Sequence, residues 1–423
     1  MKFFGRLGRR FAAMASYGYQ AIAALALVLL VGRFLKNAEY AHFSLTMATA
    51  QFAAIGAFEW VRLAATRFYP GPAAKESPKQ LASLATAFAI SALVGLFAAA
   101  SALLGGISAD VIIIGALLAV SQGATDLQLT LARFRGDLSL FSRGQAIRAS
   151  LLLVGGITGA TLTHTAIGAL CGVLSGYLVT LFIALASDRP LRETPWGEAS
   201  KALILAHVKY GAPAAAASVL HLGATLAARY AITLIAPGVT GASALMAFDL
   251  MQRPFSVVTA ALHGVLYPPV VAAYDKGGFA YAKPMLQRLY IVEIACIVVL
   301  GSTIVATLLL PQIISIIAPP AFQPSFALPG ILAAILFAVR AILINLAPLA
   351  AHLAKKISLI MLTATFDIIL MSALVALTFA IGHKDAPSVI AAFLASSSIT
   401  IILASGITLR LLSSNAQLTR SPT

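Results

Sequence analysis

Charged residues are scarce in this chain. Only 10% of its 423 residues are Asp, Glu, Lys or Arg, 60% are hydrophobic, and the mean hydropathy is +0.94. Soluble proteins carry roughly 25% charged residues, so the composition excludes an ordinary soluble domain. Apolar runs of about 20 residues, each long enough to cross about 30 Å of hydrocarbon, recur along almost the whole length. They indicate a polytopic α-helical membrane protein, because a transmembrane barrel would show alternating segments of about ten residues.

Several chemical signatures are missing from the sequence. The two cysteines, Cys171 and Cys296, lie inside apolar runs and argue against a disulfide framework. There is no Walker A loop, no His/Cys cluster with metal-ligand spacing and no nucleophile elbow. We therefore expect no catalytic residue, no bound metal and no cofactor, and the predicted protein is not an enzyme.

Twelve apolar segments predict an all-α protein with about twelve transmembrane helices. A longer hydrophilic stretch separates the first six from the last six, which predicts an N-lobe at 1–187, a cytoplasmic linker at 188–206 and a C-lobe at 207–423. The predicted spans are 12–34, 40–66, 81–104, 110–132, 145–163, 166–187, 211–236, 242–272, 286–309, 327–350, 357–381 and 387–410.

The basic residues fall in alternate loops. With the N-terminus inside, only Arg33, Lys36 and Lys384 lie outside, whereas all other loop Lys and Arg lie inside, including Arg133 and Arg148 around the start of the fifth span. This alternation follows the positive-inside rule and predicts that both termini are cytoplasmic. The net charge of +15 is thereby explained by topology, and we expect no nucleic-acid partner.

The two halves carry a weak repeat. Tyr17-Gly18 and Tyr210-Gly211 open the first span of each half, and Tyr69-Pro70 and Tyr267-Pro268 close the second. Both halves begin on the inner side, so the repeats would be parallel. Secondary transporters commonly contain such repeats and bind substrate between them, near the middle of the bilayer.

Four arginines lie inside the predicted spans: Arg62, Arg229, Arg253 and Arg340. Placing a guanidinium at the centre of the bilayer costs about 2.5–3.5 kcal/mol on insertion scales, so such a residue normally faces a wet cavity or a partner. The guanidinium fork matches phosphate and carboxylate oxygens. We interpret all four as candidate contacts for an anionic substrate, with Arg340 and Arg253 foremost.

Two of these arginines have acidic neighbours on the same helix face. Glu59 precedes Arg62 by three residues, and Asp249 precedes Arg253 by four. A local ion pair is therefore the alternative to a substrate contact. For Arg253, Pro254 favours the substrate contact, since a kinked helix is tolerated mainly beside a cavity.

Four carboxylates are candidates for ion coupling: Asp126, Asp249, Glu293 and Asp367. Apolar surroundings favour the protonated form of a carboxyl group, and both H⁺ and Na⁺ are candidate ions. Arg229 and Arg340 have no acid within four residues. Asp126, Glu293 and Asp367 are therefore equally suited to be counter-ions of these arginines. Two histidines, His221 and His263, lie in spans 7 and 8 and are interpreted as packed side chains, with a proton relay as the alternative.

Several motifs resemble those of a known transporter family. They are Tyr210-Gly211-Ala212-Pro213, Arg229-Tyr230, the segment 247–254 with Asp249, Arg253 and Pro254, Tyr267-Pro268-Pro269, and Thr66-Arg67-Phe68. The chain is similar to the polysaccharide transport family, the Wzx-type flippases of the multidrug/oligosaccharidyl-lipid/polysaccharide (MOP) exporter superfamily. It departs from the family pattern at Ala228, where members commonly carry an Asp before the arginine.

The resemblance implies a MATE-like transporter of two six-helix lobes that alternates between inward-open and outward-open states. Its cargo would be a polyprenyl-pyrophosphate-linked oligosaccharide, flipped across the bacterial inner membrane for lipopolysaccharide, capsule or exopolysaccharide synthesis. Expected partners are this lipid-linked oligosaccharide, membrane lipids, and a glycan polymerase and glycosyltransferases of the same pathway. The alternatives are a cation-coupled multidrug exporter of the same superfamily and a membrane glycan polymerase or ligase.

Overall fold

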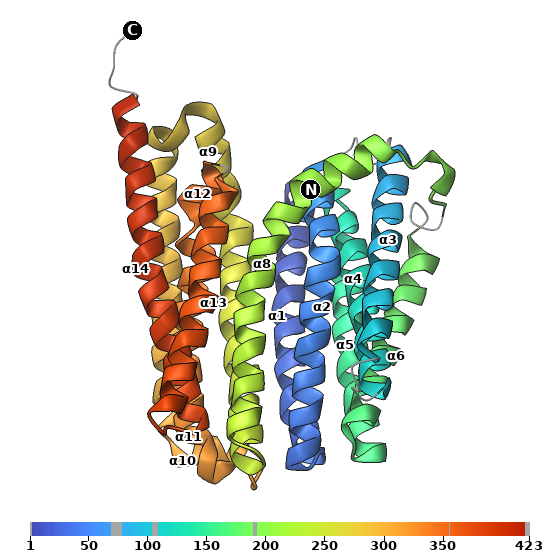
Figure 1. The fold of residues 1–423 in the computed structure, drawn as a ribbon. Coiled ribbons are helices and arrows are strands. Elements are labelled where there is room, and N and C mark those ends of the chain that lie inside the picture. Colours follow the sequence, from blue (N-terminus) through green and yellow to red (C-terminus); the bar gives the residue numbers. More distant parts are fainter. Residues whose placement is uncertain (1, 69–77, 104–108, 189–192, 355, 419–423) are drawn as a thin grey trace. The chain divides into compact units, whose positions relative to one another are not determined.

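The computed structural model describes residues 2–68, 78–103, 109–188, 193–354 and 356–418, and nearly all of them are helical. The predicted all-α class is therefore confirmed (Figure 1). The chain divides into two compact units, Met1–Leu222 and Gly223–Thr423.

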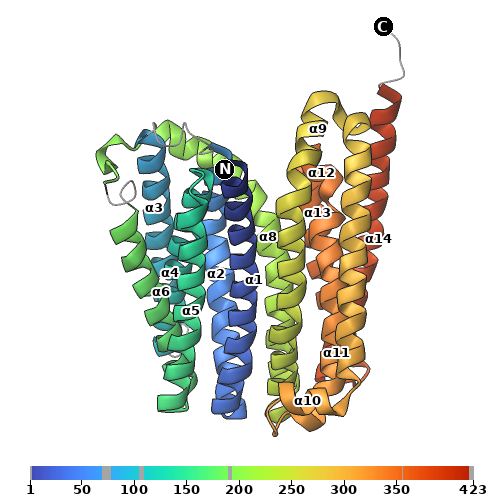
Figure 2. The ribbon, with the colours of Figure 1, turned by 180° about the vertical axis from the view of Figure 1, so that it is seen from behind.

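The first unit contains six long helices and the beginning of another (Figures 1 and 2). With 22 to 33 residues each, the six measure about 33–50 Å at 1.5 Å per residue, enough to cross a bilayer. They are α1 (Lys2–Phe34), α2 (Asn37–Phe68), α3 (Pro78–Leu103), α4 (Ala109–Phe134), α5 (Leu138–Thr163) and α6 (Ala166–Ser187), followed by the short η2 (Trp196–Glu198) and the start of α8 (Lys201–Ile235).

Glycines hold α5 and α6 unusually close. A Cβ added to Gly155 would lie 2.2 Å from the carbonyl oxygen of Gly172, and one added to Gly172 would lie 1.9 Å from that of Gly155. One turn away, a Cβ added to Gly159 would lie 2.0 Å from the carbonyl oxygen of Gly168. Small residues at such crossings let two backbones approach within a membrane, where van der Waals packing drives helix association.

The boundary between the units lies inside α8, on the C-terminal side of the predicted linker 188–206. The first part of α8 packs on α2: a Cβ at Gly211 would lie 2.1 Å from the carbonyl oxygen of Trp60. Phe68 contacts the rings of His207 and Tyr210 at centroid distances of 5.2 and 5.7 Å. These contacts attach the beginning of α8 to the first unit. Tyr69-Pro70, one end of the predicted repeat, lies outside the described residues.

The second unit is built around one very long helix. α9 (Val239–Leu308) is interrupted at Gly277 and Gly278, where Gly278 adopts a φ of 66° that glycine accepts without steric cost. The helix turns back there into two legs, 239–276 and 279–308 (Figure 1). The remaining elements are α10 (Pro311–Ile317), α11 (Gln323–Ala341), the π-helical turn η3 (Ile342–Leu346), α12 (Leu349–Leu353), α13 (Ile357–Ala380) and α14 (Ala386–Leu418).

All twelve predicted spans are helical over most of their described residues, with turns or bends at 236, 309, 347–348 and 381, and ten helices are both long and apolar enough to cross a membrane. Those ten do not include α2 and the first leg of α9. The two are long enough but more polar, and they carry Glu59 with Arg62 and Asp249 with Arg253. The second helix of each predicted half therefore carries an acidic and a basic residue within its apolar stretch.

Candidate functional site

A pocket of about 160 Å³ lies inside the first unit, and polar side chains dominate its wall. Three arginines face one carboxylate across it. The lining residues come from α1, α2, α4 and α5, and they are Tyr17, Gln20, Arg62, Asp126, Leu129, Thr130, Arg133, Phe141, Gln145 and Arg148.

Arg148 was predicted to lie at the inner surface, and the structure corrects this. α5 begins at Leu138 rather than at residue 145, because Asp137 caps it by accepting a hydrogen bond of 2.9 Å from the Leu140 amide. Arg148 therefore lies about three turns inside the helix and is buried. Its Nη1 donates to Asp126 Oδ1 at 2.5 Å, and its Nη2 donates to Gln145 Oε1 at 3.0 Å.

Arg62 is the one predicted substrate contact that lines this pocket. The alternative, a local pair with Glu59, is present: Arg62 Nε donates to Glu59 Oε2 at 2.7 Å, and Nη2 donates to Oε1. The Arg62 side chain nevertheless remains 40% exposed, whereas that of Glu59 is 11% exposed and does not line the pocket. Part of the guanidinium is thus available to a ligand.

Arg133 completes the cationic wall. Its Nη1 donates to the Tyr17 hydroxyl at 3.3 Å, and its guanidinium carbon lies 4.9 Å from the centre of the Phe134 ring. With Arg62 and Arg148 it gives three guanidinium groups against the single lining carboxylate of Asp126. This excess of positive charge and N–H donors suits an anion with several oxygens, such as a phosphate or carboxylate.

Arg229 finds its acid on the neighbouring helix. Its Nη1 donates to Asp249 Oδ1 at 2.6 Å and its Nη2 to Gln252 Oε1 at 3.1 Å, both on the first leg of α9. Asp249, for which a local pair with Arg253 was one interpretation, is therefore a tertiary counter-ion of Arg229. The non-helical residues of α9 are Gly277 and Gly278, so its break does not fall at Pro254.

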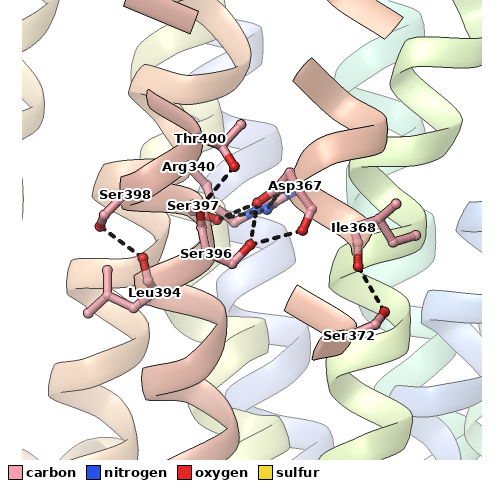
Figure 3. Close-up of polar contacts among 9 residues, drawn as sticks. All are labelled: Arg340, Asp367, Ile368, Ser372, Leu394, Ser396, Ser397, Ser398 and Thr400. Atoms are coloured by element: carbon pink, nitrogen blue, oxygen red, sulfur yellow. Dashed lines mark hydrogen bonds and ion pairs between the residues drawn. The ribbon is translucent and has the colours of Figure 1, made fainter. Parts of the chain in front are cut away.

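Arg340, the foremost candidate from sequence, lies in a closed network between three helices (Figure 3). Its Nη1 donates to Asp367 Oδ2 at 2.9 Å and to Ser397 Oγ at 3.2 Å, and its guanidinium carbon lies 4.4 Å from the Phe393 ring centre. Asp367 also accepts a hydrogen bond of 2.8 Å from the Ser396 hydroxyl. Arg340 thus has a counter-ion on another helix, and the carboxylate of Asp367 neutralises its buried charge.

Glu293 differs from the other acidic candidates. Asp126, Asp249 and Asp367 each pair with an arginine, whereas Glu293 on the second leg of α9 faces His263 on the first leg. His263 Nδ1 lies 3.2 Å from Glu293 Oε2.

No protein-family model and no curated protein sequence matches the chain, but solved structures do. An inward-facing multidrug resistance MATE family transporter of the MOP superfamily has a TM-score of 0.70 and 13% identity, over 94% of this chain and 96% of that chain. An outward-facing conformation of such a transporter has a TM-score of 0.63 and 14% identity, over 96% of this chain and 95% of that chain. The chain has the fold of the MOP superfamily transporters.

Another MOP superfamily transporter, from Pyrococcus furiosus Vc1, gives a TM-score of 0.65 at 14% identity, over 96% of this chain and 94% of that chain. Its binding pocket is described as reversed in polarity, with a different function suggested for it. At such identities the likeness shows the MOP fold alone. The fold predicted from the motifs is therefore confirmed, while membership of the superfamily and of its polysaccharide transport group rests on the sequence.

Proposed function

We propose that the protein flips a polyprenyl-pyrophosphate-linked oligosaccharide from the inner to the outer leaflet by alternating access. The observation that carries this proposal is the pocket of the first unit, with Arg62, Arg133 and Arg148 in its wall. A diphosphate carries several anionic oxygens, and the guanidinium fork binds such oxygens through paired, charge-assisted hydrogen bonds. The lipid tail can remain in the bilayer while the headgroup is held.

The position of the pocket supports loading from the cytoplasmic leaflet. Arg62 and Arg133 lie near the C-terminal ends of α2 and α4, and Arg148 lies near the beginning of α5. In the predicted topology these three ends face the cytoplasm. At 1.5 Å per residue, all three arginines are within about 15 Å of those ends. A headgroup made on the cytoplasmic side would reach them without crossing the bilayer first.

The pocket charge also argues against the alternative of a cationic-drug exporter. The structures with the same fold include multidrug resistance transporters. A cation in this pocket would meet three arginines, and the one lining carboxylate, Asp126, is already bonded to Arg148. Like charges in a desolvated site repel strongly, so an anionic cargo fits this wall better.

We place this activity in a bacterial inner membrane, in lipopolysaccharide, capsule or exopolysaccharide synthesis. A glycan polymerase and glycosyltransferases would act on the same cargo, and an ion gradient or consumption of the product would drive the cycle.

The test is a deletion strain complemented with variants. Deletion should cause the lipid-linked intermediate to accumulate in the inner leaflet, and the wild-type chain should clear it. Arg62→Gln combined with Arg133→Gln should leave the accumulation in place. Lys79→Gln, an exposed charge change on α3 outside the pocket, is the matched control and should clear it. Normal clearance by the double variant, at equal protein level, would contradict the proposal.

A further inference from the structure

Glu293 is a buried carboxyl group without an arginine. It is 0% exposed, and His263 is the ionisable group in contact with it among the described residues. Neither Glu293 carboxyl oxygen, nor His263 Nδ1, has a hydrogen-bond partner with proper geometry in that part of the chain, so the 3.2 Å approach is an ion-pair contact. His263 is 23% exposed, so its ring lies between the buried carboxyl group and the surroundings.

Electrostatics restricts the proton content of this pair. A bare carboxylate in an apolar interior costs several kcal/mol even after relaxation, and here no fixed cation offsets it. The pair can be neutral Glu293 with neutral His263, or ionised Glu293 with protonated His263. Both forms hold one proton more than the ionised carboxylate beside a neutral imidazole. The structure in this conformation therefore favours one bound proton.

The neighbouring ionisable groups do not replace that proton. Tyr290 interacts electrostatically with Glu293, and its hydroxyl donates to the Leu346 carbonyl at 3.0 Å, at the end of the π-helical turn η3. His352 on α12 interacts with His263, and the Tyr267 ring lies 5.6 Å from it.

The other elements packed on α9 contribute little charge. η3 and α10 have no ionisable residue, α11 contributes only Arg340, and α14 contributes only Arg410. α8 contributes Arg229, which is bonded to Asp249. Arg340 is bonded to Asp367. Within the described part of the chain, the negative charge of Glu293 can thus be neutralised only by protonated His263 or by a proton on the carboxyl group itself.

We propose that Glu293 and His263 form a proton-binding site that couples proton movement to the separation of the two legs of α9. The pair joins residues of the two legs, which are connected at Gly277 and Gly278 and also pack together through the apolar cluster of Val270, Ala273, Ala282, Leu286 and Leu289. When the proton leaves through His263 to water, the remaining carboxylate must be hydrated, and hydration requires the legs to part. This inference rests on the proposed transport function for its role but not for the binding itself.

The chemistry selects a proton over Na⁺. Hard metal cations prefer several oxygen ligands. Here an imidazole nitrogen faces the carboxyl group, and the Tyr290 hydroxyl is used by Leu346.

The first experiment measures proton binding without any cargo. pH-difference infrared spectra of the purified full-length protein in lipid nanodiscs should show a protonated-carboxyl carbonyl band that disappears as the pH rises. Glu293→Gln should abolish this band, and His263→Gln should shift the pH at which it disappears. Glu198→Gln, at an exposed position in η2, is the control and should leave it unchanged. Replacing Na⁺ by choline should have no effect.

Two outcomes would overturn the site: a band that persists in Glu293→Gln, or one that depends on Na⁺ at constant pH. Thermal unfolding of each variant verifies that it is folded, and His263→Gln provides a second test that leaves the carboxyl group in place.

Flipping in proteoliposomes under an imposed pH gradient then tests coupling. Wild-type flipping should accelerate with the gradient and Glu293→Gln flipping should not. A variant that still responds to the gradient overturns the coupling. If the protein flips no lipid-linked glycan but retains the titrating band, the proposed function fails and the proton site stands.

Discussion

Arg340 donates a hydrogen bond of 2.9 Å to Asp367, and neither side chain is more than 3% exposed. Removing one partner of such a pair leaves the other charge buried, at a cost of about 3–5 kcal/mol. We expect Arg340→Met to lower the thermal unfolding temperature of the purified protein strongly. Adding Asp367→Leu to Arg340→Met should recover part of the loss, since no bare charge is then buried.

Equal stability of the single variant and the wild type would contradict a structural role for this pair. The double variant also tests the substrate role predicted from sequence, because a stable double variant that supports normal glycan export would remove Arg340 from the substrate contacts.

Close packing of α5 on α6 gives a second prediction. Gly172→Ala places a methyl group against the Gly155 backbone, so the helices must separate, and overpacking of this kind costs about 1–3 kcal/mol. Gly56→Ala is the matched control, because a Cβ there meets nothing within 4 Å and alanine favours a helix by about 0.5–1 kcal/mol. Thermal unfolding should therefore move in opposite directions for the two variants. A stabilised Gly172→Ala would be inconsistent with the observed contact.

His207 should make stability depend on pH. It lies outside the apolar spans, and burial lowers the pKa of its imidazole below the ordinary value of 6.5. Neither ring nitrogen has a hydrogen-bond partner among the described residues, and the ring packs on Phe68. Below pH 6.5 the unfolded chain binds a proton that the folded chain resists, so stability should fall as the pH drops through that value.

His207→Phe keeps the aromatic contact and removes the titration. The difference in unfolding temperature between pH values above and below 6.5 should be smaller in this variant than in the wild type. An identical pH dependence in both proteins would exclude His207 as its source.

The predicted topology can be tested by cysteine labelling. In a background without Cys171 and Cys296, Ser325→Cys at the start of α11 should react with an impermeant maleimide from the outside. Lys276→Cys, beside the break in α9, should react only after the membrane is permeabilised. Labelling of both from the same side would break the model of twelve spans with both termini inside.

The helices could be predicted from the sequence because each needs a long apolar stretch to cross hydrocarbon, and hydropathy records that need directly. The partners of the arginines were harder to predict. Glu59 and Arg62 lie three residues apart on one helix, so their bond is a local property of the sequence. Arg340 and Asp367, or Arg229 and Asp249, meet only when separate helices pack.

The burial of Arg148 was missed from the sequence for a different reason. A basic residue close to the end of an apolar run resembles any positive-inside loop residue, and only the Asp137 cap reveals that α5 starts earlier. Asp137 followed by Leu138 is a readable start signal in the sequence. With it, Gln145 and Arg148 fall on one helix face three residues apart, and both line the pocket.

Binding of a polyprenyl diphosphate lipid to the purified protein, measured by native mass spectrometry against the uncharged polyprenol, tests the anionic pocket most directly. The wild type should retain the diphosphate lipid in preference to the polyprenol. Arg62→Gln with Arg133→Gln should weaken that preference at least about tenfold, since a hydrogen bond to a charged group contributes about 1.5–3 kcal/mol. Equal retention of the two lipids by the wild type, or an unchanged preference in the folded double variant, would contradict an anionic headgroup site in the first unit.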